Sequence, residues 1–303
     1  MERKIPRFFL SKKGKKSGPL IFLDRKDASS TIPPKKIGGN QTRRMPELPE
    51  VETLCRQLKR TIVGAVVQDL VILDAKIGHL ENVAGLRVRS VERQGKFLLI
   101  HLDQDLTLHL HLRMSGRLLW QRHPDALPTH SRFIIRLPQG ILVCVDPRRF
   151  ATLALNDPKD RTASVPDPLK ALNASILRET AQGRQTPVKS FLLDQSVVAG
   201  IGNIYACEML HEASVSPWRR AGSLSAAEWR KIARAGHNIL RKATECRGTS
   251  ISDWRDLYGE KGEYQLHLAV YGRRGLPCPR CGETIRRMAI SGRGTWHCAT
   301  CQK

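Results

Sequence analysis

The chain has 303 residues and is 41% hydrophobic, which is enough for two domains with buried cores. No apolar run approaches the ~20 residues of a membrane helix, and no signal-peptide pattern is visible, so we expect a cytoplasmic protein without a membrane span. Lys and Arg number 51 against 28 Asp and Glu, a net charge of +23. This excess points to nucleic acid as the first choice of partner and to an acidic membrane surface as the second.

Residues 1–44 differ from the rest of the chain. They hold 13 Lys and Arg and three Asp and Glu, mixed with Gly, Ser and Pro and without sustained periodicity. Such a composition buries too little apolar surface to fold alone, so it predicts a disordered basic extension. Residues 45–303 keep a net charge of +13, so the body of the protein is basic in its own right.

The periodicity of residues 45–160 predicts a β-sandwich domain with flanking helices. Apolar residues at helical spacing predict a helix that begins near Pro49 and ends before Gly64. The pattern then changes to period two, with Gly, Pro and Asp in the turns, as is typical of short antiparallel strands. The expected strands cover residues 65–73, 86–94, 97–102, 106–112, 132–137 and 141–146.

The remainder predicts helices followed by a small cysteine module, so the fold class is α+β with several domains. Residues 161–186 are interpreted as a linker that runs into a helix, and residues 187–265 as a helical domain. Within that domain, Ser225 and Glu228 form a capping-box pattern at the start of a long amphipathic helix. Residues 266–303 are expected to form a zinc finger.

Four of the eight cysteines form two close pairs, Cys278 with Cys281 and Cys298 with Cys301. Each pair allows one tight turn to present two thiolates, and four thiolates predict one tetrahedral Zn²⁺ site. A redox dithiol pair is the weaker alternative. Because four protein ligands leave no open position, this zinc is expected to fold a β-hairpin rather than to catalyse.

Five motifs follow one another along residues 45–303. They are MPELPEVET (45–53), HLRMSG (111–116), DPRRF (146–150), GIGNIYA (200–206) and the four-cysteine module. In this order they resemble the bacterial formamidopyrimidine-DNA glycosylases. The related endonuclease VIII type usually has Gly where this chain has Leu48, which favours the formamidopyrimidine type. The resemblance implies a helix–two-turn–helix motif and a monomer that binds double-stranded DNA containing oxidised bases or abasic sites, at the nucleoid.

The resemblance also assigns catalytic roles. A free Pro46 amine would attack C1′ of the damaged nucleotide, and the resulting iminium would acidify the C2′ proton, which couples base excision to β,δ-elimination. Glu47 would be the general acid/base. Lys96 would donate a proton in β-elimination, and Arg293 would hold the lesion phosphates and assist δ-elimination. Taken singly, these residues are interpreted as a helix start, a helix-dipole carboxylate and solvated surface charges.

An enzyme that reaches C1′ must take the nucleotide out of the base stack. Met114, Arg148 and Phe150 resemble the residues that fill the resulting void, pair with the orphaned cytosine and kink the duplex. The alternative for Met114 and Phe150 is a place in the sandwich core. Further DNA contacts are expected from Asn203 in the Gly-rich turn and from His130, Arg184 and Lys189.

Three features depart from the family pattern. Arg113 and Ala151 stand where the family usually has Gly, although neither change removes a catalytic group. With Met45 attached, the Pro46 nitrogen is a tertiary amide and no nucleophile. Three interpretations remain: the true start is Met45, a leader is cleaved before Pro46, or the extended chain is real and blocked.

Two functions therefore stay open. The first is an enzyme that excises 8-oxoguanine and formamidopyrimidines and then nicks the strand. The second is a non-enzymatic nucleic-acid binder that keeps the fold and the zinc module. The intact mass of the native protein separates them, because only a chain that starts at Pro46 has the nucleophile.

Overall fold

The computed structural model describes residues 45–156, 165, 167–251 and 253–303. The prediction of disorder for residues 1–44 lies outside this range. No helix in the described part is long and apolar enough to cross a membrane.

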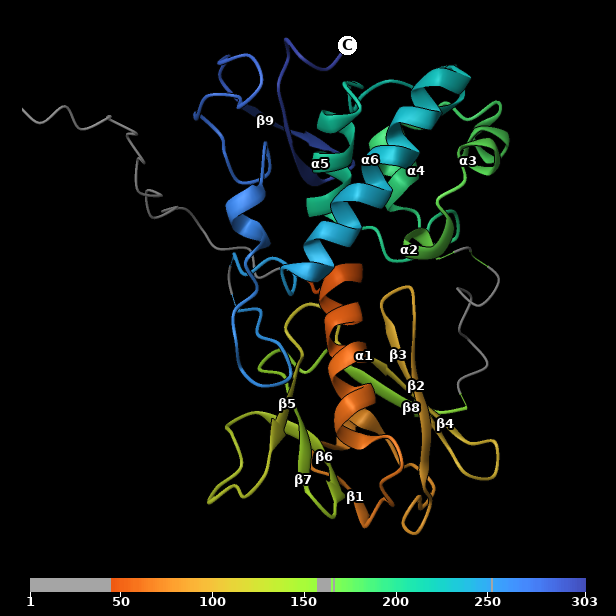
Figure 1. Cartoon of the computed structure of the whole chain (residues 1–303), viewed down its shortest axis with the longest axis vertical. Coiled ribbons are helices and arrows are strands. Elements are labelled where there is room, and N and C mark those ends of the chain that lie inside the picture. Colours follow the sequence, from red (N-terminus) through yellow and green to blue (C-terminus); the bar gives the residue numbers. More distant parts are fainter. Residues whose placement is uncertain (1–44, 157–164, 166, 252) are drawn as a thin grey trace, which may run out of the picture. The chain divides into compact units, whose positions relative to one another are not determined.

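Helix α1 (Leu48–Ile62) and eight strands form the N-terminal half (Figure 1). One antiparallel sheet has the order β1 (Asp69–Ile72), β6 (Ser131–Leu137), β7 (Gly140–Val145) and β5 (Arg117–Gln121). The other has the order β2 (Val88–Gln94), β3 (Phe97–Leu102), β4 (Thr107–His111) and β8 (Thr152–Leu155), and the short 3-10 helix η1 spans Ala75–Ile77. The β-sandwich prediction is confirmed, while β5 and the four-residue β8 are strands that the period-two pattern did not single out.

Helix α1 covers the sandwich because one of its faces is apolar. Val51, Leu54, Leu58 and Ile62 recur every three or four residues and are at most 1% exposed in the sandwich core. The β2–β3 turn at Gly95 places Lys96 at the end of the sandwich that meets the helical half.

The helical half contains α2 (Pro168–Ala171), α3 (Ala174–Ala181), α4 (Val188–Leu193), α5 (Asn203–Glu212) and α6 (Ala226–Glu245), with η2 (Ala221–Ser223) and η3 (Tyr264–His267). The predicted capping box at Ser225 and Glu228 is present at the start of α6. Leu177 of α3 is buried in the same core as Trp229 of α6. Most of the segment interpreted as a linker is therefore part of this helical domain, because α3 has an apolar face to bury.

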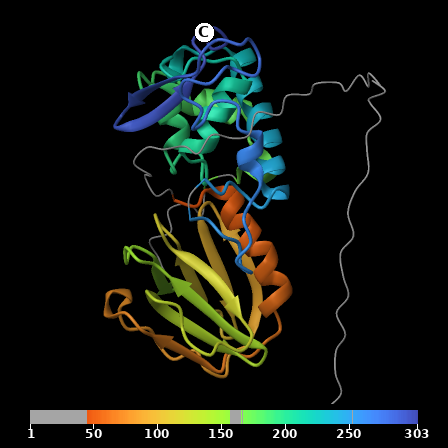
Figure 2. The same cartoon turned by 90° about the vertical axis from the view of Figure 1, so that its left-hand side faces the viewer.

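The segment that follows α6 and contains Trp254 and Leu257, called the strap below, packs back against the sandwich. Trp254 and Leu257 are buried in the sandwich core, and the Trp120 amide donates to the Leu257 carbonyl at 2.8 Å. The chain then ends in an antiparallel hairpin, β9 (Arg286–Ile290) and β10 (Arg293–His297). Strand β10 packs against α5, so the hairpin lies on the helical domain (Figure 2).

Candidate active site

Glu47 lies at the junction of α1 and α5. It precedes α1, and its side chain is 4% exposed. Its Oε1 accepts the Ile204 amide at 3.0 Å, and its Oε2 accepts the Tyr205 amide at 3.4 Å, so the carboxylate caps the N-terminus of α5. Burial raises the pKa of Glu47, against the opposing effects of Lys96 and these amides. A carboxyl group of this kind holds a proton at a higher pH than an exposed one, as a general acid requires.

Gly202 makes this approach possible. A Cβ at position 202 would lie 2.2 Å from Glu47 Cδ and 2.5 Å from Oε1. Gly200 is similarly constrained, since its φ is +99° and a Cβ would lie 2.7 Å from Leu48 Cδ1. The two glycines of the GIGN motif therefore allow α5 to approach residues 47 and 48 closely.

Lys96 is 6% exposed, and its Nζ donates to the Ile201 carbonyl at 3.1 Å. Burial lowers its pKa, which the charge of Glu47 partly offsets and that of Arg293 reinforces. Lys96 was expected to donate a proton in β-elimination. Here its amine faces the same turn as Glu47, where a lowered pKa favours proton transfer.

Glu50 is a further member of the site, although it was assigned no role from the sequence. Its Oε1 accepts the Tyr205 hydroxyl at 2.6 Å and the Thr249 amide at 2.7 Å, and its Oε2 accepts the Glu47 amide at 2.9 Å. Burial and the neighbouring Glu47 raise the pKa of Glu50 to about 7. This network fixes the backbone at Glu47. Tyr205 lies within the GIGNIYA motif, but no sequence signal indicated that Tyr205 and Thr249 contact Glu50, because these contacts form only in the folded chain.

Pro46 is buried, with residues of α5 and the strap beside it. A cavity of about 10 Å³ adjoins it, lined by Met45, Glu50, Ile204, Thr249, Ile251 and Trp254. Such a volume accommodates about one water molecule. Met45 therefore occupies part of the space beside the proposed nucleophile.

The zinc hairpin approaches the same turn from the other side. Asn203 Nδ2 donates to the Gly294 carbonyl at 2.9 Å, next to the exposed Arg293 at the start of β10. Lys189 was expected to contact DNA, but its side chain is fully buried, and its Nζ donates to Thr295 Oγ1 at 2.9 Å. In this structure Lys189 therefore fastens α4 to the hairpin and offers no exposed charge.

The three void-filling candidates lie on two loops that share one carboxylate. Asp146 is fully buried and accepts the backbone amides of Arg148, Phe150 and Ala151, at 3.1, 2.7 and 2.7 Å. It also accepts the hydroxyl of Ser115, the neighbour of Met114. One buried acceptor therefore holds both loops in place.

The side chains of these loops are available at the surface. Phe150 is 40% exposed, which excludes a place in the core, and the Arg148 guanidinium lies 4.7 Å from its ring centre. Met114 is half-buried. Arg113 has a φ of +52°, a left-handed conformation that explains why Gly suits this position. His130 and Arg184 are exposed, and the structure gives them no contact with Glu47.

The four cysteines meet as predicted. Their Sγ atoms all lie within 4.8 Å of one another, with Cys278 and Cys301 at 3.9 Å and Cys281 and Cys298 at 3.4 Å. Thiolates around one tetrahedral zinc lie about 3.8 Å apart, given Zn–S bonds of about 2.3 Å. The cluster therefore fits one structural zinc ion that fixes the base of the hairpin.

Comparisons with known proteins agree with this geometry. Family models match in three consecutive blocks: the formamidopyrimidine-DNA glycosylase N-terminal domain (45–153), the H2TH domain of the same enzymes (165–254) and a zinc finger found in FPG and IleRS (275–303). The formamidopyrimidine-DNA glycosylase of Pelotomaculum thermopropionicum is 38% identical over 274 residues, which are 86% of this chain and 99% of that protein. That of Exiguobacterium sibiricum is 40% identical over 279 residues, with the same coverage.

Solved structures give the same result. The MutM (FPG) protein of Thermus thermophilus is 38% identical with a TM-score of 0.76, covering 85% of this chain and 98% of that one. A Lactococcus lactis FPG mutant in complex with a Fapy-dG-containing DNA is 30% identical with a TM-score of 0.78, covering 85% and 100%. The chain therefore belongs to the formamidopyrimidine-DNA glycosylase family, whose members are DNA glycosylases and AP lyases that act on damaged bases.

Proposed function

We propose that this chain excises oxidised purines, 8-oxoguanine and formamidopyrimidines, through a Schiff base on the Pro46 amine, and then cleaves the strand by β,δ-elimination. The observation that carries the proposal is the Glu47 carboxylate, buried beside Pro46 and close to the lowered-pKa amine of Lys96. A buried acid beside this nitrogen and a buried amine close to the acid supply both proton transfers that the reaction needs.

In the proposed reaction, Pro46 N attacks C1′ and the bond from C1′ to the base breaks, so that the base leaves with a proton and the Pro46 nitrogen loses its own. The C1′–O4′ bond then opens, O4′ takes a proton from Glu47, and the C1′–N bond becomes an iminium. The iminium withdraws electrons, the C2′ proton is removed, and the 3′ C–O bond breaks in β-elimination. Glu47 handles the protons at the sugar, and Lys96 donates to the departing group. Arg293 binds the phosphates and assists the second elimination.

The rest of the DNA surface follows from the same proposal. Met114, Arg148 and Phe150 fill the void in the duplex, and Asn203, His130 and Arg184 contact phosphates. Lys189 acts indirectly by holding the hairpin that carries Arg293. The protein acts as a monomer on DNA at the nucleoid. Solved Lactococcus lactis relatives are complexes with abasic-site and Fapy-dG DNA, which supports these substrates.

The proposed active form begins at Pro46. Removal of Met45 frees a secondary amine with an ordinary pKa near ~8 and clears one wall of the small cavity beside it. The first family model starts at residue 45, which supports a functional start there.

The test compares protein begun at Met45 and processed to Pro46 with the full chain from Met1. Each is incubated with a duplex carrying 8-oxoguanine opposite cytosine and treated with borohydride. We expect a covalent complex with the processed protein only. Its Glu47→Gln variant should form far less of this complex, because base excision is slowed when the general acid is lost. No trapping by protein shown by mass to start at Pro46 would falsify the mechanism. Duplex binding without trapping would then favour the non-enzymatic binder.

A further inference from the structure

The exposed surface of α6 carries a cluster of cations. They are Arg230, Lys231, Arg234, Arg241 and Lys242, all exposed, and we call this set the α6 basic face. At 3.6 residues per turn, the five positions fall within about 120° of the helix circumference, opposite the buried Trp229, Ile232 and Leu240. Solvated helix surfaces usually carry both positive and negative side chains, so a face with five cations indicates a negatively charged binding partner.

Acidic neighbours do not neutralise this face. Glu228 is half-buried and pairs with Arg219 at 2.8 Å, away from the cations of the face. Glu245 lies 3.9 Å from Arg241, an exposed pair with little binding strength. Within the described residues, the structure gives no ion pair to Arg230, Lys231, Arg234 or Lys242.

The basic face is separate from the surface assigned to catalysis. Strand β10, which begins at Arg293, packs on α5, and α5 also packs on α6. Figure 2 shows the dark-blue hairpin on one side of the helical domain and the light-blue α6 on the other. A duplex bound along Arg293 and Asn203 therefore leaves the α6 face uncovered.

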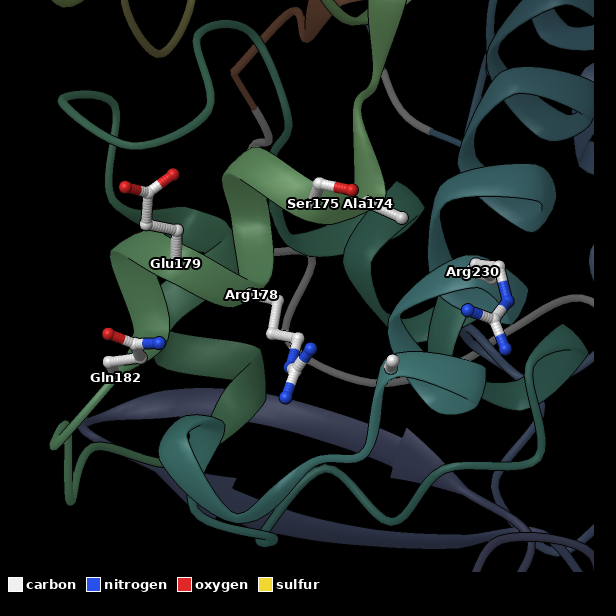
Figure 3. A pocket seen from close by; sticks show the side chains of 7 residues that line it. Ala174, Ser175, Arg178, Glu179, Gln182 and Arg230 are labelled. Carbon is white, nitrogen blue, oxygen red and sulfur yellow. The ribbon is translucent and has the colours of Figure 1, made fainter.

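A hollow at the start of α6 extends the face. It has a volume of about 420 Å³ and lies between α3 and the first turn of α6. The guanidinium groups of Arg178 and Arg230 stand on its two sides, and the Glu179 carboxylate points away from the gap between them (Figure 3). Two guanidinium groups around one hollow suit a phosphate, because each planar fork donates paired hydrogen bonds.

The chemistry of the face favours DNA over an acidic protein. Protein interfaces depend on large apolar or aromatic anchors, and α6 exposes no large hydrophobic side chain. Arg230 and Arg241 are eleven residues apart, or about 16 Å along the helix. A duplex presents a charge every ~1.7 Å of its axis when both strands are counted, so a span of this length runs past about nine phosphates, enough to supply one to each cation of the face.

We propose that the α6 basic face, with Arg178 at its end, binds the phosphate backbone of a second double-stranded DNA segment while the first occupies the catalytic surface. The protein can bind the second segment before it dissociates from the first, so it can transfer between DNA segments without passing through bulk solution. This role is independent of base excision, because it needs no lesion and no free Pro46 amine.

The test counts duplexes per protein. The full chain is titrated with an undamaged 14-base-pair duplex at low salt, and native mass spectrometry and fluorescence anisotropy resolve the first and second binding steps. We expect two duplexes per wild-type chain. Arg230→Glu/Arg234→Glu should weaken the second step at least about tenfold, since each lost phosphate contact costs close to that factor at low salt, and should change the first step less than about twofold.

The matched control is Arg122→Glu/Arg136→Glu, which reverses two exposed arginines of the sandwich and should leave both steps unchanged. Arg230→Lys/Arg234→Lys keeps the charge and should keep the second step. The salt dependence of the wild-type second step is an independent measure, with an expected slope of log K against log salt of about −4 to −5 for five contacts. A single duplex at saturation, or equal second-step affinities for the charge-reversed and control proteins, overturns the proposal. Binding of poly-glutamate in place of a second duplex also overturns it, in favour of an acidic protein partner.

Discussion

Gly202→Ala isolates the packing that positions Glu47. The backbone at residue 202 is extended, with φ −126° and ψ −167°, so alanine fits it without strain. The new methyl group, however, would lie 2.2 Å from Glu47 Cδ. The carboxylate must then leave the amides of Ile204 and Tyr205. Hydrogen bonds to a charged group contribute about 1.5–3 kcal/mol, so losing one good and one long bond costs about 2–4 kcal/mol.

If this loss appears in the chemical step, the excision rate falls by about 30- to 1000-fold. The assay is single-turnover excision by protein that starts at Pro46, with excess enzyme so that binding does not limit the rate. Gly85→Ala is the control, because a Cβ there meets no atom within 4 Å. Its φ of +84° strains alanine and lowers stability, but the position is remote from Glu47, so its excision rate should stay within about twofold of wild type.

A double-mutant cycle sharpens the test. If Gly202→Ala acts only by displacing the carboxylate, adding it to Glu47→Gln should slow excision by no more than about twofold. A wild-type rate for Gly202→Ala refutes the argument that this glycine makes room for Glu47. Independent, multiplicative losses in the double variant show instead that alanine disturbs the site by another route.

Three further predictions concern the loops, the pH dependence of stability and the metal. Asp146→Asn weakens the hydrogen bonds that the amides of the Phe150 loop and the Ser115 hydroxyl of the Met114 loop donate to this side chain. It should therefore lower lesion-duplex affinity by at least about tenfold and the free energy of unfolding by about 2–4 kcal/mol. Unchanged lesion-duplex affinity, measured by fluorescence anisotropy, contradicts this. Burial, then the charges of Arg113 and Lys96, lower the pKa of His111 to about 3, so the unfolded chain binds a proton that the folded chain does not. Its contribution to stability is complete above pH ~6.5 and is lost as pH falls toward 3. Between pH 6 and 4, the unfolding free energy of the wild type should therefore fall more steeply than that of His111→Asn, by up to about 1.4 kcal/mol per pH unit. Urea titrations at several pH values measure both free energies. If the two free energies fall in parallel with pH, the prediction is wrong. Removing zinc by chelation should expose Trp296, seen in its fluorescence, and weaken lesion-duplex binding while the far-ultraviolet helical signal persists. Undiminished binding by protein shown to be metal-free argues against a DNA-contacting hairpin.

Much of the site was predictable because its signals are local. Cys278 and Cys281 are one turn apart, and so are Cys298 and Cys301, so spacing alone indicated a metal site. The motifs that hold Pro46, Glu47 and Phe150 are short runs whose order identified the family. Six of the eight strands of the sandwich were predicted from their alternating or apolar runs, because most strands bury at least one face.

Other features depend on contacts between distant residues. Lys189 looks like a surface cation in the sequence, yet it is buried against Thr295, more than a hundred residues further along the chain. Glu50 looks like a first-turn helix carboxylate, yet it accepts hydrogen bonds from Tyr205 and Thr249. No local pattern encodes such partners, because burial and pairing are set by the segment that packs on top.

The sequence by itself determined the elements, the metal ligands and the residue types available for chemistry, because periodicity and short spacings act within a few residues. Only the tertiary structure decided which of these residues are buried, which contacts they make and how their pKa values shift. It placed Glu47 at the N-terminus of α5 through the space left by Gly202, shifted the pKa values of Glu47 and Lys96 by burying both, and enclosed Pro46 beside Met45. The physical reason is that desolvation and close packing arise only where segments remote in the sequence come into contact. The sequence of neither segment encodes them by itself.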